Sequence, residues 1–404
     1  MIYLDHAATT PLDPAVLDAM LPYLREDYGN ASSVHQLGRR ARVAIERARE
    51  QVAAHLRCEP SEVIFTSGAT EANNAALRGV LAAVPERPGL VTSAAEHEAI
   101  LQPAEALREA GHPVTVLAPS GTGAVTSEHV ANVLDALSSA ETPAGLVSVM
   151  LVNNELGTVS PVADIAQAAR ERGAYMHTDA VQAATLFDLD VDTLGIDLLS
   201  LSGHKMYGPK GVGVLYVRSG TPIVPMVLGG AQERRRRGGT ENVAAVVGLA
   251  AALDLAVARR AEERTRLMQL QQRLARRLAE AFGDVVCFNT PLQPYANHVA
   301  EVAPHILNVS VGPSNGVSLD GEMLLLNLDL AGVLVSSGSA CASGAVEPSH
   351  VLRALQVPAA TANATVRFSL GRATTEADID TAFERVHAAV SRMCGAISGP
   401  LGEG

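Results

Sequence analysis

The stretch Ser200–Gly213, which reads SLSGHKMYGPKGVG, constrains the fold of this chain more than any other. The apolar run before it predicts a buried strand, and Gly203 ends that strand directly before Lys205. An unpaired ammonium at the end of a buried strand is costly to desolvate. The same desolvation lowers the pKa of a lysine and makes it a nucleophile that can form a Schiff base. On this stretch alone, a solvated lysine beside a tight turn remains an alternative.

A second stretch, residues 174–182, also reads as a short strand and places Asp179 at its end. Pyridoxal phosphate enzymes need a lysine and an acid that keeps the pyridine nitrogen protonated, so that the ring can accept electrons. The spacing from Asp179 to Lys205 leaves room for one strand, a connection and the next strand. Neighbouring parallel strands would bring both residues to one carboxyl edge, where ligands bind in open α/β sheets.

Strands and helices alternate along the first part of the chain, which predicts an α/β fold with a mostly parallel sheet. After the strand that ends at Thr66, the turn Ser67–Thr70 leads into a helix, and the amino end of a helix is a natural phosphate site. A basic amphipathic helix is expected over residues 37–56, with its arginines on a solvated face. With 404 residues, the chain is long enough for a large domain and a smaller one.

Charge and composition exclude several classes of protein. The net charge of −12 argues against a nucleic-acid-binding surface. We expect no membrane span, because no apolar run is long enough, and no secretory signal, because the N-terminus has neither a basic region nor an apolar core. The four cysteines are far apart and form no CxxC pair, which favours a reducing compartment, and we expect a cytoplasmic protein.

The motifs HTDAVQ and SLSGHKMYGPKG resemble those of the class V aminotransferase family, and SSGSACASGAVEPSHVLRAL narrows the resemblance to cysteine desulfurases of the NifS/IscS type. The resemblance extends from YLDHAATTP to VRFSLGRATTEADID, nearly the whole chain. It implies a PLP-transferase fold of type I. The large cofactor-binding domain is then expected over residues 12–260. Residues 1–11 and 261–404 would form a smaller α+β domain with the sulfur-acceptor loop and the substrate-carboxylate arginine.

The resemblance also implies roles for individual residues. Lys205 would carry the cofactor, His97 would stack on its ring and assist proton transfers, and Arg367 would bind the substrate carboxylate together with Asn154. The remaining residues expected around pyridoxal phosphate are Ala69, Thr70, Asn154, Asp179, Gln182, Ser202, His204 and Thr240. We expect Thr240 to complete the phosphate site of a partner subunit, which implies a homodimer. No metal site is expected.

The segment Ser336–Gly344 is rich in serine and glycine, so we expect an exposed and mobile loop around Cys341. Cys287 and Cys394 lie in apolar stretches and are expected to be buried. A reactive thiol needs access and thiolate character. The resemblance makes Cys341 the nucleophile that accepts sulfur from L-cysteine as a persulfide, leaving alanine. Sulfur-acceptor proteins for iron–sulfur cluster assembly or tRNA thiolation are the implied partners.

Three alternatives stay open at this point. The chain could be a selenocysteine lyase or another class V lyase, although these do not need a cysteine on a long loop. It could be a sulfur-relay scaffold with little activity of its own, although both Lys205 and Asp179 are present. The third alternative is that the four arginines 234–237 bind tRNA. They most simply indicate a solvated loop, and the acidic net charge disfavours a stable contact with tRNA.

Overall fold

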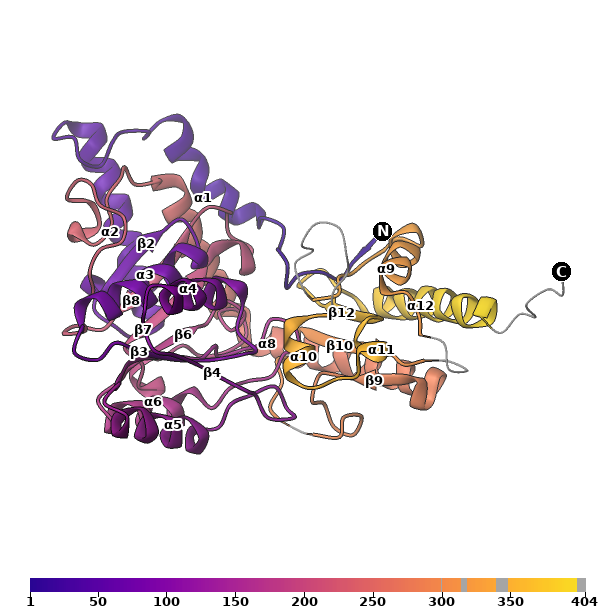
Figure 1. Ribbon diagram of the computed structural model, residues 1–404. Coiled ribbons are helices and arrows are strands. Elements are labelled where there is room, and N and C mark those ends of the chain that lie inside the picture. Colours follow the sequence, from indigo (N-terminus) through magenta and orange to yellow (C-terminus); the bar gives the residue numbers. More distant parts are fainter. Residues whose placement is uncertain (299, 314–317, 339–347, 398–404) are drawn as a thin grey trace.

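The computed structural model describes residues 1–298, 300–313, 318–338 and 348–397 (Figure 1). Its larger part is built on one seven-stranded sheet with the strand order β2-β8-β7-β6-β5-β3-β4. The strands of this sheet are β2 (Val63–Thr66), β3 (Gly89–Ser93), β4 (Val114–Leu117), β5 (Ala144–Ser148), β6 (Tyr175–Asp179), β7 (Leu198–Ser202) and β8 (Gly213–Val217).

The sheet is mostly parallel, as the sequence predicts. The pairs β3–β4, β3–β5, β5–β6 and β6–β7 run parallel, whereas β8 is antiparallel to both β7 and β2. Nearly every residue of β5, β6 and β7 is buried, because helices cover both faces of the sheet. Because β5, β6 and β7 run parallel, their carboxyl ends meet at one edge of the sheet.

Helices form a layer on each face of the sheet (Figure 1). On one face, α3 (Ala69–Ala83) and α4 (Glu98–Glu109) share a buried apolar cluster with the strands. The other face packs against a larger cluster, whose members include residues of α2 (Gln36–Leu56), α5 (Ser127–Ser139), α6 (Val162–Glu171) and α8 (Val243–Phe282). The helix α1 (Pro14–Arg25) lies against α8, and α7 (Val191–Leu194) is a single turn.

The smaller part contains an antiparallel sheet of order β12-β10-β9, built from β9 (Val286–Phe288), β10 (Ile306–Val311) and β12 (Thr365–Ser369). The N-terminal strand β1 (Ile2–Tyr3) pairs with β11 (Val333–Leu334). The helices of this part are α9 (Gly321–Leu330), α10 (His350–Ala354), α11 (Ala359–Ala362) and α12 (Glu376–Ile397).

The long helix α8 packs against α1 and α2 in the larger part and against α12 in the smaller part. It passes without a break through residue 260. The domain limits expected from the sequence remain a prediction. None of the described helices is both long and apolar enough to cross a membrane.

Two expectations about burial were wrong. Arg49 on α2 is not solvated: its side chain is 3% exposed, because its guanidinium pairs with Glu233, which is also 3% exposed. Cys287 is exposed, because β9 is the edge strand of the small sheet. The strand β5 also ends earlier than its apolar run suggests, at Ser148.

Candidate active site

The carboxyl edge of the large sheet opens into a chamber of about 870 Å³. The strand β6 ends at Asp179, and its parallel neighbour β7 leads through a single helical turn to Lys205. Among the residues expected from the sequence, those that line this chamber are Ala69, Thr70, His97, Asn154, Asp179, Gln182, Ser202, His204, Lys205 and Arg367. A volume of this size is within the range of small-molecule sites.

The Lys205 side chain points back toward the N-terminal segment. Its Nζ donates to the carbonyl oxygens of Ala7 at 2.6 Å and Ala8 at 2.7 Å. Burial and the nearby positive charge of Arg367 lower the pKa of Lys205 to about 8, although Asp179 and Asp5 act in the opposite direction. A larger fraction of this amine is therefore neutral near neutral pH than is usual for a lysine.

The carboxylate of Asp179 is held on both oxygens. The backbone N–H of Val181 donates to Oδ1 at 3.0 Å, and Nδ2 of Asn73 donates to Oδ2 at 2.7 Å. Asn73 lies on α3, is fully buried, and lines the chamber. Asn73 is not among the site residues expected from the sequence. Its position one helical turn after Thr70 was the available signal, because residues three apart share a helix face.

His97 is the N-cap residue of α4, and its Nδ1 accepts a hydrogen bond of 3.0 Å from the backbone N–H of Ala99. Burial lowers the pKa of His97 first, and Lys205 adds to this, while Asp179 opposes it. A neutral imidazole that accepts at Nδ1 must carry its proton on Nε2. The helix cap therefore fixes the tautomer of His97.

The turn before α3 forms a cradle suited to a phosphate group. Gly68, the N-cap of α3, has a φ of 152°, a conformation that a residue with a Cβ rarely adopts. A Cβ at Gly213 would lie only 2.6 Å from the Gly68 backbone, so two chain segments approach closely here. Ser202 and His204 also line this region of the chamber, and His204 Nδ1 lies 3.1 Å from Thr9 Oγ1. The amino end of α3 and these polar groups are the donor set that an anion needs.

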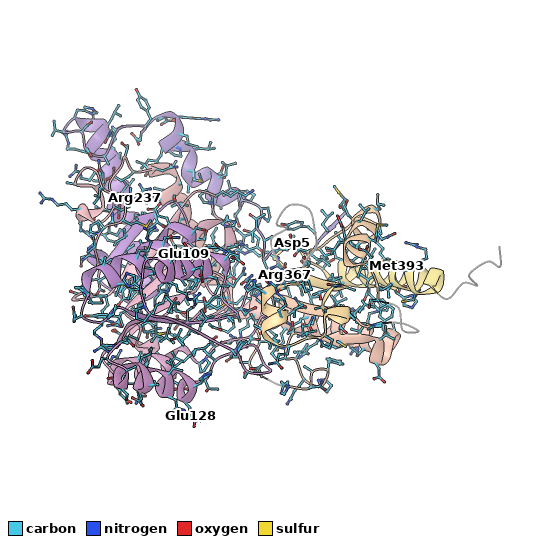
Figure 2. All side chains as sticks on the ribbon, in the orientation of Figure 1. Asp5, Glu109, Glu128, Arg237, Arg367 and Met393 are labelled. Atoms are coloured by element: carbon cyan, nitrogen blue, oxygen red, sulfur yellow. The ribbon has the colours of Figure 1, made fainter. Side chains whose placement is uncertain are left out.

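Arg367 brings a guanidinium from β12 of the small sheet into the chamber. Its Nη1 donates to the carbonyl oxygen of Asn154 at 2.8 Å, and its Nη2 donates to Asp5 Oδ1 at 3.0 Å. Figure 2 shows Asp5 and Arg367 close together where the two parts of the molecule meet. Two atoms here have no partner among the described residues, Arg367 Nε and Asn154 Oδ1. Nη1 and Nη2 of Arg367 each keep a further N–H that a substrate carboxylate could use.

The buried carboxyl group of Glu155 also lines the chamber, although Glu155 is not among the site residues expected from the sequence. Ser349 donates a hydrogen bond to Glu155 Oε2, and a Cβ at Gly338 would lie 3.0 Å from the same oxygen. Burial raises the pKa of Glu155, while Ser349 acts in the opposite direction. Glu155 therefore connects the strand β5 side of the chamber to residues on both sides of the segment 339–347.

The structure does not bring Thr240, which is expected to complete a partner's phosphate site, into the chamber. This residue is exposed. Cys341 lies outside the described residues. In the arginine cluster 234–237, Arg234 and Arg236 bond to backbone carbonyls of Pro60 and Ser61, and Arg237 pairs with Glu71.

Comparisons with known proteins agree with this arrangement. Residues 2–382 match the family described as Aminotransferase class-V. The chain is 41% identical over 395 residues to a protein of Dictyoglomus turgidum named Cysteine desulfurase IscS, covering 97% of this chain and 95% of that protein.

Solved structures also match over nearly the full length. A NifS-like protein superposes with a TM-score of 0.86 at 34% identity, covering 97% of this chain and 99% of that one. A structure titled SspA in complex with cysteine gives a TM-score of 0.76 at 34% identity, covering 92% of this chain and 99% of that one. The PLP-transferase fold of type I that the sequence implies is thereby confirmed.

Proposed function

This chain belongs to the class V aminotransferase family, and from that premise we propose that it is a cysteine desulfurase that converts L-cysteine to L-alanine and retains the sulfur as a persulfide on Cys341. The observation that carries the proposal is the meeting of Lys205, Asp179 and Arg367 in one chamber. A proton-transferring amine, an acid and a carboxylate-binding guanidinium are the groups that amino-acid chemistry of this type requires.

The chamber residues fit pyridoxal phosphate. We propose that the turn at Gly68 and the start of α3, with Ala69, Thr70, Ser202 and His204, hold its phosphate. Asp179 would face the pyridine nitrogen, Gln182 the ring hydroxyl, and His97 one face of the ring. When bound to Lys205, this cofactor supplies an electron-accepting ring system.

The residues around it then have defined tasks. Arg367, already oriented by Asp5 and Asn154, binds the substrate carboxylate through its free N–H groups. Lys205, with its lowered pKa, takes and returns a proton at the substrate Cα. The proton on Nε2 of His97 is available for hydrogen bonding to the substrate, because the cap of α4 occupies Nδ1.

Sulfur transfer itself is a step between two sulfur atoms. The Cys341 thiolate attacks the substrate sulfur, so that an S–S bond forms and the Cβ–S bond breaks with its electron pair left on carbon. That carbon takes up a proton and becomes the methyl group of alanine, while the sulfur stays as the persulfide. The two sulfur atoms that form the persulfide are oxidised and the substrate Cβ is reduced, so no external oxidant is needed.

A persulfide must be passed on, so we propose acceptor proteins for iron–sulfur cluster assembly or tRNA thiolation as partners. We also propose a homodimer, in which Thr240 serves the neighbouring site. We place the reaction in the cytoplasm, because persulfide transfer depends on thiols that are kept reduced.

The test is a comparison of two cysteine variants. The purified protein with pyridoxal phosphate should be yellow, should change its absorbance on addition of L-cysteine, and should release alanine and, with a thiol reductant, sulfide. Cys341→Ala should lose both products at least a hundredfold and keep the colour. Cys287→Ala is the matched control, because this exposed cysteine lies on the edge strand β9 and should leave the activity unchanged.

Full activity of Cys341→Ala would contradict the nucleophile assignment and favour a lyase that needs no acceptor cysteine. A protein that stays colourless with added pyridoxal phosphate would overturn the cofactor and favour the scaffold alternative.

A further inference from the structure

A second, smaller pocket of about 30 Å³ lies directly beside the chamber. Lys205 and Gln182 line both spaces, so these two side chains separate them. The other side of the pocket is formed by His6, Tyr207 and His305. A pocket of this size has room for about two water molecules.

Two buried imidazoles with an unsatisfied nitrogen line this pocket. Both His6 and His305 are 7% exposed, and Nδ1 of each has no partner among the described residues. Burial lowers the pKa of His6 to about 4 and that of His305 to about 3, so both rings are neutral. A buried polar atom of this kind almost always has a hydrogen-bond partner in native proteins, either protein or water.

The amide of Gln182 determines the tautomer of His305. Nε2 of Gln182 donates to the carbonyl oxygen of Ala7 at 2.9 Å, so it is the amide oxygen Oε1 that lies 3.3 Å from His305 Nε2. An amide oxygen only accepts, and therefore His305 Nε2 carries the proton. Nδ1 of the neutral His305 is then a buried acceptor that lacks a donor among the described residues.

We propose that this pocket binds an ordered water molecule that donates to His305 Nδ1, and that His305 is a positioning residue that holds Gln182 with its amide N–H groups directed away from the pocket. One N–H of Gln182 is used by Ala7, and the other remains for the chamber that Gln182 lines. The inference rests on the proposed function in one respect, because that second N–H would meet the bound cofactor.

The first test is a high-resolution crystal structure of the protein loaded with pyridoxal phosphate. We expect an ordered water within about 2.7–3.2 Å of His305 Nδ1. A protein donor at that nitrogen, or a pocket without ordered water density, would overturn the water site. A flipped Gln182, with its amide nitrogen toward His305, would overturn the positioning role.

The second test measures the affinity of the apoprotein for pyridoxal phosphate by absorbance titration. His305→Leu should weaken binding about tenfold and shift the absorption maximum of the bound cofactor, because the buried oxygen of Gln182 loses its donor. His305→Gln should restore both values, since its amide N–H can replace Nε2–H. Leu267→Ala is the control, because Leu267 lines the same pocket without a polar contact.

Leu267→Ala should lower the thermal stability and leave the affinity and the spectrum unchanged. If His305→Leu and Leu267→Ala alter the affinity equally, the positioning role is wrong and His305 acts only by packing. If the unaltered protein binds no cofactor at all, the proposed function fails instead, so the two failures are distinguishable.

Discussion

The environment of the Lys205 ammonium differs strongly from that of a solvated lysine. Its ammonium has two carbonyl partners, from Ala7 and Ala8, but burial and the positive charge of Arg367 disfavour the charged form. The depressed pKa of about 8 means that the neutral amine accumulates as the pH rises toward that value, and changes little above it.

This predicts the pH dependence of cofactor attachment. In the apoprotein, the rate at which pyridoxal phosphate becomes covalently bound should rise with pH, with a midpoint near 8 rather than near the ordinary lysine value of 10.5. Stopped-flow absorbance across the pH range measures it. Arg367→Gln should move the midpoint upward, because it removes a positive charge that lowers the pKa of Lys205.

Asp179→Asn should move the same midpoint downward, because the Asp179 carboxylate raises that pKa. An unchanged midpoint in both variants would show that desolvation alone sets the pKa of Lys205. Absence of covalent attachment in Lys205→Ala is the baseline for the series.

The two site residues that local sequence patterns identified, Asp179 and Lys205, share one property. Asp179 and Lys205 are polar residues that follow apolar strand runs, and the parallel pairing of β6 and β7 brings them to one edge. Asp5 and His305 lack such a signal, and Asn73 has only its position one helical turn after Thr70. Each contacts a site residue more than 100 positions away, so its role depends on tertiary contacts that no local pattern records.

At the scale of elements, the loop between β8 and α8 is fastened by buried charge. Arg49 on α2 forms two hydrogen bonds to the carboxylate of Glu233, and Phe65 N–H donates to the same group. Glu233, Arg234 and Arg235 all have positive φ, between 43° and 65°, which is strained for residues with a Cβ. The ion pair stabilises a conformation that the loop would not adopt by itself.

Removing one member of this pair should therefore be costly. Glu233→Ala leaves the buried, charged Arg49 with only the exposed Glu46 carboxylate and the Val63 carbonyl as partners, and we expect a loss of about 3–5 kcal/mol in the free energy of unfolding. Urea denaturation measures it. The matched control is Asp27→Ala, which removes the partner of Arg40 in an exposed pair and should change stability little. Equal effects of both variants would contradict the argument.

The helix α2 shows why an amphipathic pattern can give the wrong burial for a single residue. The sequence predicts the helix over 37–56 well, and the structure has it at Gln36–Leu56. It places Arg49 on the solvated face, because helical periodicity cannot report that Glu233, 184 residues later, supplies a buried partner. Element positions follow from local patterns here, whereas the burial of a charge follows from long-range pairing.

At the scale of the whole molecule, the position of Thr240 outside its own chamber is the main argument for a shared site. Thr240 follows the loop anchored by Glu233 and is exposed, while the phosphate cradle at Gly68 lies in the chamber. If Thr240 serves the partner subunit, Thr240→Ala should weaken cofactor binding about tenfold, the value of one hydrogen bond to a charged group. The loss would then belong to the neighbouring chain.

Mixed dimers separate the two chains. Joining a Lys205→Ala chain to a Thr240→Ala chain with two affinity tags leaves one site with both native residues, Lys205 from one chain and Thr240 from the other. Such dimers should bind one cofactor per dimer at the unaltered affinity and show about half the activity. In the matched control, both substitutions are in one chain and its partner is unaltered. The single remaining lysine site then faces the altered threonine, so binding should be weak. The opposite pattern would mean that Thr240 acts within its own chain, and a monomer in solution would remove the shared site altogether.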